Sequence, residues 1–401
     1  MMRARPLMVL IGAFAAMWAG ISGVADAAAA ACSADHAVFI PLGELPGGFV
    51  DSTAEAISDD GCVVVGESDS ANGLEAFAWH DAIMTGLGDL DGGIFDSHAL
   101  GASADGSVIV GQATSSAGQR AVRWSGGGAV ELLPPAEPMV QADTIATAVS
   151  DDGSIVVGSL DYGPWGCALR WVGEAAADLL GTCDGGFSVE PAIAWNVSAL
   201  GDVVVGARGG QFPPRFGPTA FRSEAGEVTM LPGLATCEFA SFGYAYDVSS
   251  DGRVAVGTSC STGGAREAVR WEDGQAGALG YGTGTYAIGV SADGSIVVGG
   301  ADTGGLHDEA IIWDRRHGVR SLKALLEQTG LDLTGWTLID ARDVSADGRS
   351  IVGSGRNPQG WSEAWLARLP EPAGVALDAA ALAVLATRAL GSARAARSPR
   401  R

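Results

Sequence analysis

The sequence predicts an all-β protein, a seven-bladed β-propeller of four-stranded blades that the N-terminal strand closes. Three observations predict it: a turn motif recurs seven times, a strand-like motif follows each copy, and one further motif stands displaced at the start of the body. The composition agrees, because 60 Gly in 401 residues indicate many turns, and 47% hydrophobic residues suffice for a core.

The turn motif reads Ser-x-Asp-Gly before a valine-rich run, as in the segment 58–65. Asp-Gly between two such runs is typical of a β-hairpin, and the Ser and Asp side chains can bond the turn backbone. The valine run fits a strand buried on both faces. Leu200 replaces the aspartate in the fourth copy, so we expect that repeat to be less regular. The serines are 45, 47, 48, 51, 42 and 54 residues apart, and the other six copies carry Asp60, Asp105, Asp152, Asp251, Asp293 and Asp347.

The second motif follows each serine and is clearest in Ala121-Val122-Arg123-Trp124. Its alternation places Val and Trp on one face of a strand and Arg on the other. A third motif, Leu87-Gly88-Asp89-Leu90, is expected to supply a short fourth strand, which completes the unit of a propeller blade. Ser321 before leucines 322, 325 and 326 predicts one short helix with a serine N-cap.

Closure is predicted from a displaced motif. Leu42-Gly43-Glu44-Leu45 matches the third motif but precedes the first turn, whereas the last repeat ends without one. We therefore expect Val38–Leu45 to complete the seventh blade, with Phe39 or Ile40 in backbone pairing range of Trp365 or Leu366. A β-solenoid is the alternative, but its coils are shorter and more uniform, and its ends never meet.

The two ends of the chain differ from the body. Residues 1–31 are predicted to be a signal peptide, because two arginines precede an apolar run and small residues. Residues 32–369 form the seven-repeat propeller, and residues 370–401 hold a Pro-Glu-Pro motif, an apolar segment and an arginine-rich tail. A retained N-terminal anchor and an unstructured C-terminal tail are the alternatives.

Cysteine usage supports export, since six cysteines follow the predicted signal peptide. Each of two pairs lies near a single hairpin, which predicts the disulfides Cys167–Cys183 and Cys237–Cys260. Cys32 either pairs with Cys62 or carries a lipid after the preceding alanines.

A search for chemistry predicts no catalytic residue, no cofactor and no metal site. The five histidines show no ligand spacing, and neither a nucleophile elbow nor a phosphate-binding loop occurs. A net charge of −23 excludes nucleic acid as a partner. The repeated Ser and Asp residues are interpreted as structural. Calcium at Asp89-Leu90-Asp91-Gly92 stays an open alternative, although later oxygen ligands and a closing Glu are missing.

The three linked motifs resemble the HAF-repeat family of bacterial extracellular proteins over residues 37 to about 368. The C-terminal tip resembles a PEP-CTERM sorting signal, with Pro370, Glu371 and Pro372 as its motif. These resemblances imply export, display at the cell surface and processing by an exosortase-type enzyme, with membrane contact only through the termini. They imply no known reaction.

Two function classes are consistent with the sequence. The favoured hypothesis is an exported, non-enzymatic protein of the cell surface or extracellular matrix, a rigid acidic scaffold that binds a glycan or matrix polymer. The alternative is a polysaccharide hydrolase or lyase with its site in the propeller channel. Such an enzyme needs carboxylates or histidines that converge from several innermost strands, and turns that keep the same residues do not show that divergence.

Overall fold

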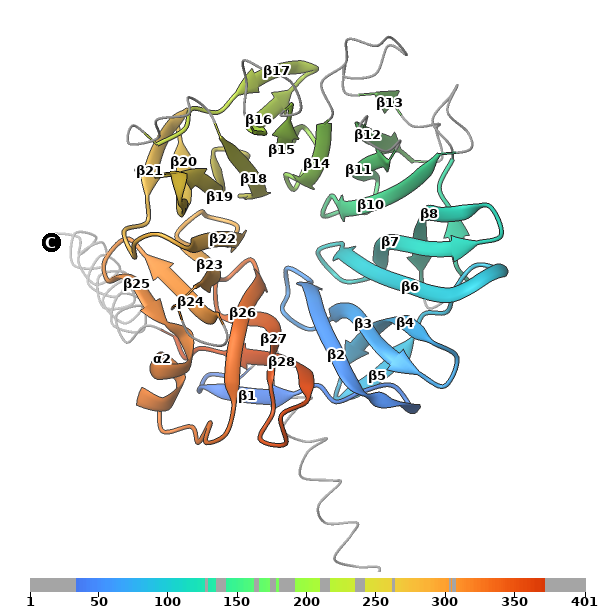
Figure 1. The fold of residues 1–401 in the computed structure, drawn as a ribbon, viewed down its shortest axis with the longest axis horizontal. Helices are drawn as coiled ribbons and strands as arrows, with labels where there is room; N and C mark the ends of the chain where they lie inside the picture. Colours follow the sequence, from blue (N-terminus) through green and yellow to red (C-terminus); the bar gives the residue numbers. More distant parts are fainter. Residues whose placement is uncertain are drawn as a thin grey trace, which may run out of the picture.

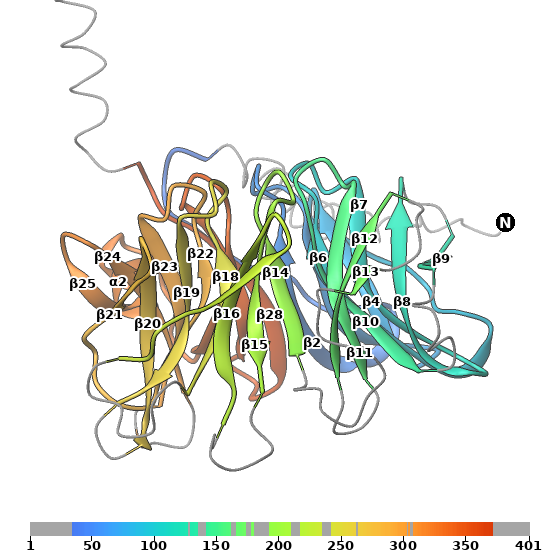
Figure 2. The same ribbon diagram turned by 90° about the horizontal axis from the view of Figure 1, so that it is seen from above.

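The computed structural model describes residues 34–126, 129–134, 142–161, 166–173, 178–179, 192–209, 217–234, 242–261, 264–302, 304 and 308–371. The described chain is all-β apart from one short helix. Its strands pair in seven antiparallel groups of four, here called repeat units 1 to 7. The units surround a common axis in the face view (Figure 1). Seen from the edge, the molecule is a thick, flat disc (Figure 2). The fold is of the β-propeller type.

The first two units follow the turn motif in chain order, with the innermost strand first. Unit 1 comprises β2(Gly47–Ile57), β3(Val64–Ser70), β4(Leu74–His80) and β5(Ile83–Gly86). Unit 2 comprises β6(Gly92–Ala102), β7(Val108–Ser115), β8(Gly118–Ser125) and β9(Glu131–Leu132). Parallel bridges at Asp51–Ser362 and Leu74–Asp96 join units 7, 1 and 2 into one 12-stranded sheet.

Units 3 to 6 are separate four-stranded sheets. Unit 3 comprises β10(Asp143–Val149), β11(Ile155–Asp161), β12(Cys167–Val172) and β13(Asp178–Leu179). Unit 4 comprises β14(Ala192–Val197), β15(Val203–Arg208), β16(Thr219–Glu224) and β17(Glu227–Met230). Unit 5 comprises β18(Gly243–Val248), β19(Val254–Cys260), β20(Arg266–Glu272) and β21(Gln275–Ala278). Unit 6 comprises β22(Thr285–Val290), β23(Ile296–Ala301), β24(Glu309–Asp314) and β25(Gly318–Ser321).

Unit 7 is built from both ends of the body. It comprises β26(Thr337–Val344), β27(Ser350–Arg356), β28(Ser362–Arg368) and the N-terminal strand β1(Val38–Pro41). Strand β1 pairs antiparallel with β28, which places Ile40 opposite Leu366 and Phe39 opposite Ala367. The predicted pairing of the two ends is confirmed, because the first and last strands lie side by side (Figure 1). A solenoid, whose ends never meet, is incompatible with this contact.

A chain of backbone hydrogen bonds links the seven turns. At six of the seven junctions the residue after the motif serine donates its N–H to the equivalent residue of the next unit, as in Ala104 N–H to Asp151 O at 3.1 Å. The chain closes on itself, because Ala346 N–H donates to Asp59 O at 3.1 Å and Asp60 N–H donates to Ala104 O at 3.2 Å. We call this set of bonds the turn ring. The turn ring joins each unit to the next on one face of the disc.

The predicted roles of Ser and Asp in the turns are confirmed. In unit 3 the Ser150 hydroxyl accepts from Ile155 N–H at 3.0 Å and donates to Asp152 at 2.8 Å. Unit 4 is not less regular, which corrects the expectation from Leu200. The Asp202 carboxylate accepts a hydrogen bond from the Ser198 hydroxyl at 2.7 Å, and Leu200 itself is exposed.

The expectation for the fourth strand needs correction. Strand β5 ends at Gly86, directly before Leu87-Gly88-Asp89-Leu90, so the third motif follows the fourth strand instead of forming it. Leu87 N–H donates to Ala76 O at 2.8 Å, and Leu87 and Leu90 pack against the core between units 1 and 2. The motif is therefore the inward turn from the outer edge of one unit to the next inner strand.

The core lies between neighbouring units. The valines and tryptophans of the strand motifs fill it, and Trp124 and Val122 are 1% and 0% exposed. Trp171 and Trp271 reach the preceding unit with an indole N–H bond to Pro134 O at 2.8 Å and to Pro232 O at 2.7 Å. The predicted helix is present as α2(Leu322–Gln328), with Ser321 as its N-cap, and its leucines 322 and 326 are buried in the core between units 6 and 7.

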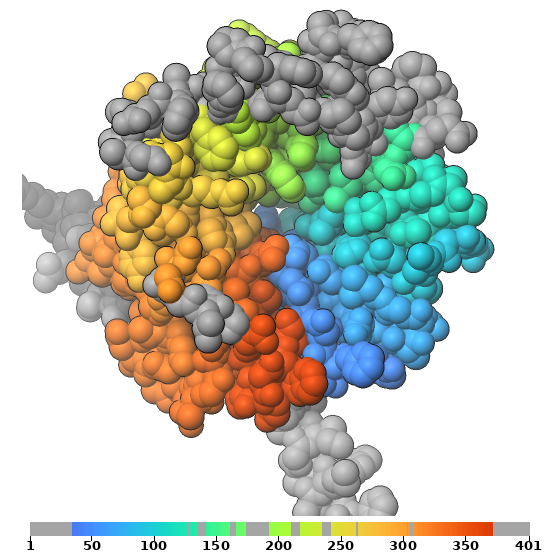
Figure 3. All heavy atoms as spheres, viewed as in Figure 1, coloured from blue at the N-terminus to red at the C-terminus, as the bar shows by residue number. Residues whose placement is uncertain are grey.

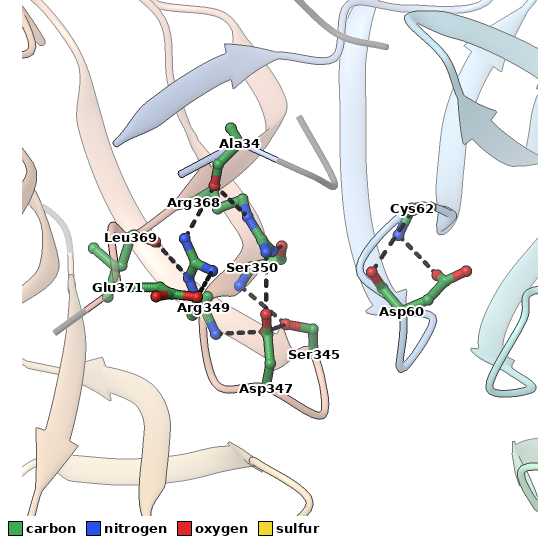
Figure 4. A network of polar contacts seen from close by, with 10 residues as sticks. All are labelled: Ala34, Asp60, Cys62, Ser345, Asp347, Arg349, Ser350, Arg368, Leu369 and Glu371. Carbon is green, nitrogen blue, oxygen red and sulfur yellow. Dashed lines mark hydrogen bonds and ion pairs between the residues drawn. The ribbon is translucent and has the colours of Figure 1, made fainter. Parts of the chain in front are cut away.

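Two arginines hold the chain ends of the body (Figure 4). Arg368 is 5% exposed and bonds Ala34 O, the Ser350 hydroxyl and the Asp347 carboxylate at 3.2, 2.5 and 3.1 Å. Arg349 donates to Ala34 O and Leu369 O at 3.0 and 3.1 Å. Because both guanidinium groups contact Ala34, the start and the end of the body are joined through the seventh turn.

Several sequence predictions fall outside the described residues. The predicted signal peptide, Pro372 and the segment after it lie there, as do Cys32, Cys183 and Cys237. The cysteines that are described, Cys62, Cys167 and Cys260, are not free thiols, and their pairing stays a prediction. Glu371 is described and forms an ion pair with Arg349 at 3.4 Å. Across the described ranges, no helix combines the length and apolarity that a bilayer crossing requires.

Candidate functional site

The candidate site is the central channel, which the inner strands of the seven units surround. It is a cavity of about 670 Å³, and the space-filling view shows the disc hollowed at its centre (Figure 3). Its size is that of sites for small molecules or short oligomers, and too small for a folded partner.

Two adjacent positions of the inner strand differ in burial and in how much the residue varies between units. Four residues before each motif serine stands an alanine that is 0% exposed, because the neighbouring units leave room for no larger side chain. These alanines are Ala54, Ala99, Ala146, Ala194, Ala245, Ala287 and Ala341. One residue later the side chain lines the channel, and it differs in every unit. These residues are Glu55, Leu100, Thr147, Trp195, Tyr246, Ile288 and Arg342.

One side of the channel is aromatic. Trp195 on β14 and Tyr246 on β18 meet edge to face with ring centroids 5.8 Å apart. Tyr246 stacks on Tyr244 at 5.7 Å, and Tyr244 meets Phe242 at the same distance. This aromatic wall presents ring faces and edges on neighbouring units, which is the type of surface on which apolar faces of ligands stack.

The opposite side is charged. Arg342 on β26 forms ion pairs with Glu55 at 3.0 Å and with Asp340 at 2.7 Å. Burial, with a smaller contribution from the charge of Glu67, raises the pKa of Glu55 to about 7, although Arg342 opposes the shift. Beside this group, the Tyr286 hydroxyl donates to Asp308 at 3.0 Å. Arg342 thus has two carboxylate partners, and the group carries a net negative charge.

Two further carboxylates join neighbouring units. Asp343 accepts Ile57 N–H at 2.9 Å and Val344 N–H at 2.7 Å, and thereby bridges units 7 and 1. Asp247 does the same between units 5 and 6, where Val290 N–H donates to it at 2.7 Å. Burial raises the pKa of Asp343 to about 7 and also raises that of Asp247. Both stand at β-bulges, which turn their side chains toward the next unit.

A third set of carboxylates lies at the mouth of the channel on the turn ring. Asp59 and Asp151 follow their motif serines and line the cavity on either side of Ala104. Burial and the charge of Asp151 raise the pKa of Asp59 to about 6. Burial and the charge of Asp152 raise the pKa of Asp151. Among the described residues, neither carboxylate has a basic side chain within 4.0 Å, so their negative charge is not compensated.

The sequence predicted a channel site only for the alternative function, and none of the residues that line the channel was predicted. The turn carboxylates bond their own turns and are not brought together in one site, as Asp251 shows by accepting the Ser249 hydroxyl at 2.8 Å. The repeated turns did not show the divergence that an enzyme needs, but in the structure Glu55 of unit 1 and Asp340 and Asp343 of unit 7 line the cavity together. The signal that the sequence contains is variation at the third residue before each motif serine, a position that the shared motifs do not include.

The carboxylate of Asp89, the first residue of the predicted calcium alternative, is engaged by backbone N–H groups. It accepts hydrogen bonds from the N–H groups of Leu90, Asp96 and Thr114 at 2.8, 2.7 and 2.8 Å. Donors that point at a carboxylate do not fit a cation there. No cluster of three or more His, Cys, Asp or Glu side chains suited to a metal occurs within the ranges that the structure covers.

Comparison with known proteins finds fold likeness only. No family profile and no curated protein matches the chain. Putative TolB from Agrobacterium tumefaciens is 17% identical with a TM-score of 0.42, over 68% of this chain and 90% of that one. The β-propeller domain of the Trilobed protease from Pyrococcus furiosus is 10% identical with a TM-score of 0.48, over 76% and 90%. At such values no argument about function rests on these structures.

Proposed function

We propose that the chain is an exported, non-enzymatic seven-bladed propeller, closed by its N-terminal strand, that binds an extracellular glycan in its channel. The observation that carries this proposal is the contrast between adjacent inner-strand positions. Alanine is kept in all seven units where the side chain packs, and seven different residues occur where it faces the channel. A purely structural repeat gives no reason for seven different side chains at the position that faces the channel.

The channel lining favours a sugar polymer over other ligands. Ring faces suit the apolar face of a pyranose, and the carboxylates, amide and hydroxyls around them can accept and donate hydrogen bonds to its hydroxyl groups. The net charge of −23 disfavours nucleic acid, and the size of the cavity disfavours a folded protein.

Binding of the full exported chain to an array of extracellular glycans tests this proposal. Trp195→Ala removes the indole ring from the aromatic wall and is expected to abolish the signal. Trp361→Ala removes an exposed tryptophan outside the channel and serves as the matched control. An array without any binding, or binding that survives Trp195→Ala but not Trp361→Ala, would overturn a channel site.

The uncompensated pair Asp59 and Asp151 supports a second candidate, a glycan hydrolase or lyase. A carboxyl group with a raised pKa beside an ionised one is the arrangement that general acid catalysis of glycoside cleavage uses. Release of new reducing ends from a bound polymer would favour this candidate, provided that Asp59→Asn abolishes it. Binding without turnover favours the first proposal.

The termini carry a separate part of the proposal. Export through a signal peptide ending near residue 31, and processing near Pro370, Glu371 and Pro372 by an exosortase-type enzyme, place the mature protein at the cell surface or outside the cell. The intact mass of the mature protein tests this. A mass that includes residues 373–401 would contradict processing at the Pro-Glu-Pro motif.

A further inference from the structure

We infer that the channel is selective for a glycan that carries free amino groups, with the ammonium held by Asp59 and Asp151 at the turn-ring mouth. This inference rests on the proposed glycan-binding function and specifies its ligand class.

The first step is the charge of the cavity. Seven carboxylates line it against two arginines, of which Arg342 is engaged by Glu55 and Asp340. An anionic glycan would meet repulsion along this wall. A ligand with ammonium groups would neutralise carboxylates that no described basic side chain reaches.

The second step is the position of the mouth carboxylates relative to the aromatic wall. Asp151 N–H donates to Ala199 O, so this aspartate lies beside the turn of unit 4, whose inner strand carries Trp195. A sugar ring stacked on Trp195 would therefore lie against unit 4, beside the unit that carries Asp151. A chain of two or more amino sugars can reach the mouth while another ring remains on the wall.

The third step concerns buried polar groups beside the channel that form no hydrogen bond of good geometry with described residues. Thr258 is 1% exposed and lines the cavity, and its hydroxyl interacts with Tyr246 of the same wall without forming a hydrogen bond of good geometry. The indole N–H of Trp195 is likewise buried without an acceptor among the described residues. A buried polar group without a partner is costly, and the hydroxyl groups of a sugar would satisfy both.

Titration of the full exported chain with two oligomers tests the inference. Glucosamine oligomers carry the amine, whereas N-acetylglucosamine oligomers of the same length have the same rings without the charge. We expect glucosamine oligomers to bind more tightly by at least about tenfold, the ratio that one charge-assisted hydrogen bond supplies. The double change Asp59→Asn and Asp151→Asn should remove that preference. Asp152→Asn removes one charge next to Asp151 but outside the cavity lining, and is the matched control.

The outcomes separate the inference from the proposed function. Equal or tighter binding of the acetylated oligomer, with loss on Trp195→Ala, overturns the amine preference and leaves a channel glycan site. A preference that survives the double change but is lost in Asp152→Asn overturns the assignment of the mouth carboxylates. Tight binding of oligolysine without binding of either sugar overturns both. Thermal unfolding of each variant shows that a lost preference does not reflect a lost fold.

Discussion

The carboxylates of the turns and those of the channel are the same chemical groups in opposite situations. A turn aspartate such as Asp251 is held by its own turn, where the Arg253 N–H and the Ser249 hydroxyl lower its pKa. A channel carboxylate such as Glu55 is buried, and burial raises its pKa to about 7 although Arg342 opposes the shift. The first kind recurs in nearly every repeat and stabilises the fold, whereas the second occurs once and is destabilised by burial. The difference teaches that repetition marks the scaffold here, and departure from repetition marks the site.

The largest effect is expected where the turn ring meets the chain ends. Arg368→Met should lower the free energy of unfolding by about 3 kcal/mol, because Ala34 O, Ser350 and Asp347 lose a buried partner together. Arg253→Met is the matched control, since that guanidinium is 77% exposed and should cost at most about 0.5 kcal/mol. Urea unfolding of both variants measures the difference. Equal losses would mean that the seventh turn does not hold the ends.

A second test compares the two adjacent inner-strand positions. Ala245→Leu should cost about 1–3 kcal/mol, because a side chain at 0% exposure has no room to grow. Leu100→Thr places the channel residue of unit 3 into unit 2 and should cost about 1 kcal/mol or less, since Leu100 is only partly buried. Thermal unfolding checks both. The contrast fails if the channel substitution is the more damaging one.

The pH dependence of stability sharpens the comparison further. Glu55, Asp59 and Asp343 have folded pKa values of about 7, 6 and 7, above their unfolded values of 4.5, 3.8 and 3.8. Between about pH 4 and pH 7 the folded state therefore binds more protons than the unfolded state, and stability must fall as the pH rises. Turn aspartates with lowered pKa values act in the other direction, because their contribution is lost as the pH falls below about 4.

We expect maximal stability near pH 4 to 5, measured as the unfolding midpoint across a pH series. Glu55→Gln should flatten the decline toward pH 7, because the amide carries no charge at any pH. Glu227→Gln, at an exposed position on β17, is the control and should leave the profile unchanged. A wild-type profile that rises steadily from pH 4 to pH 7 would contradict the raised pKa values.

The smallest effect is expected at a single turn carboxylate. In Asp251 one oxygen accepts both the Ser249 hydroxyl and the Arg253 N–H, at 2.8 and 3.0 Å, so an amide oxygen can replace it. Asp251→Asn should change the free energy of unfolding by no more than about 0.5 kcal/mol in urea titrations. A larger loss would show that the turns need the charge as well as the acceptor.

The repeat pattern was sufficient to predict much of the architecture. Ser-x-Asp-Gly acts locally, so its hairpins could be recognised without knowing the neighbouring units. The displaced motif at Leu42 also predicted the pairing of β1 with β28, which the register confirms. The fourth strand was placed a few residues too late, because Leu87 carries a strand-like pattern while its role is to pack and bond at the turn inward.

The channel could not be predicted in the same way. Glu55 and Arg342 are 287 residues apart, and only the ring brings them to 3.0 Å. A raised pKa depends on burial between units, which a turn motif does not report. The clue that the sequence did contain was variation three residues before each serine, and it becomes meaningful once that position is known to face the axis.

Paired substitutions within single units test the central claim most directly. In units 4 and 5, Trp195→Ala and Tyr246→Ala change channel residues, while Ser198→Ala and Ser249→Ala change the turns that follow them. Glycan affinity and unfolding free energy are measured for all four variants. We predict that the channel variants lose affinity by more than about tenfold and keep most of their stability, whereas the turn variants lose about 1–2 kcal/mol and keep their affinity. Channel variants that unfold more easily while binding as tightly as the wild type would contradict the account.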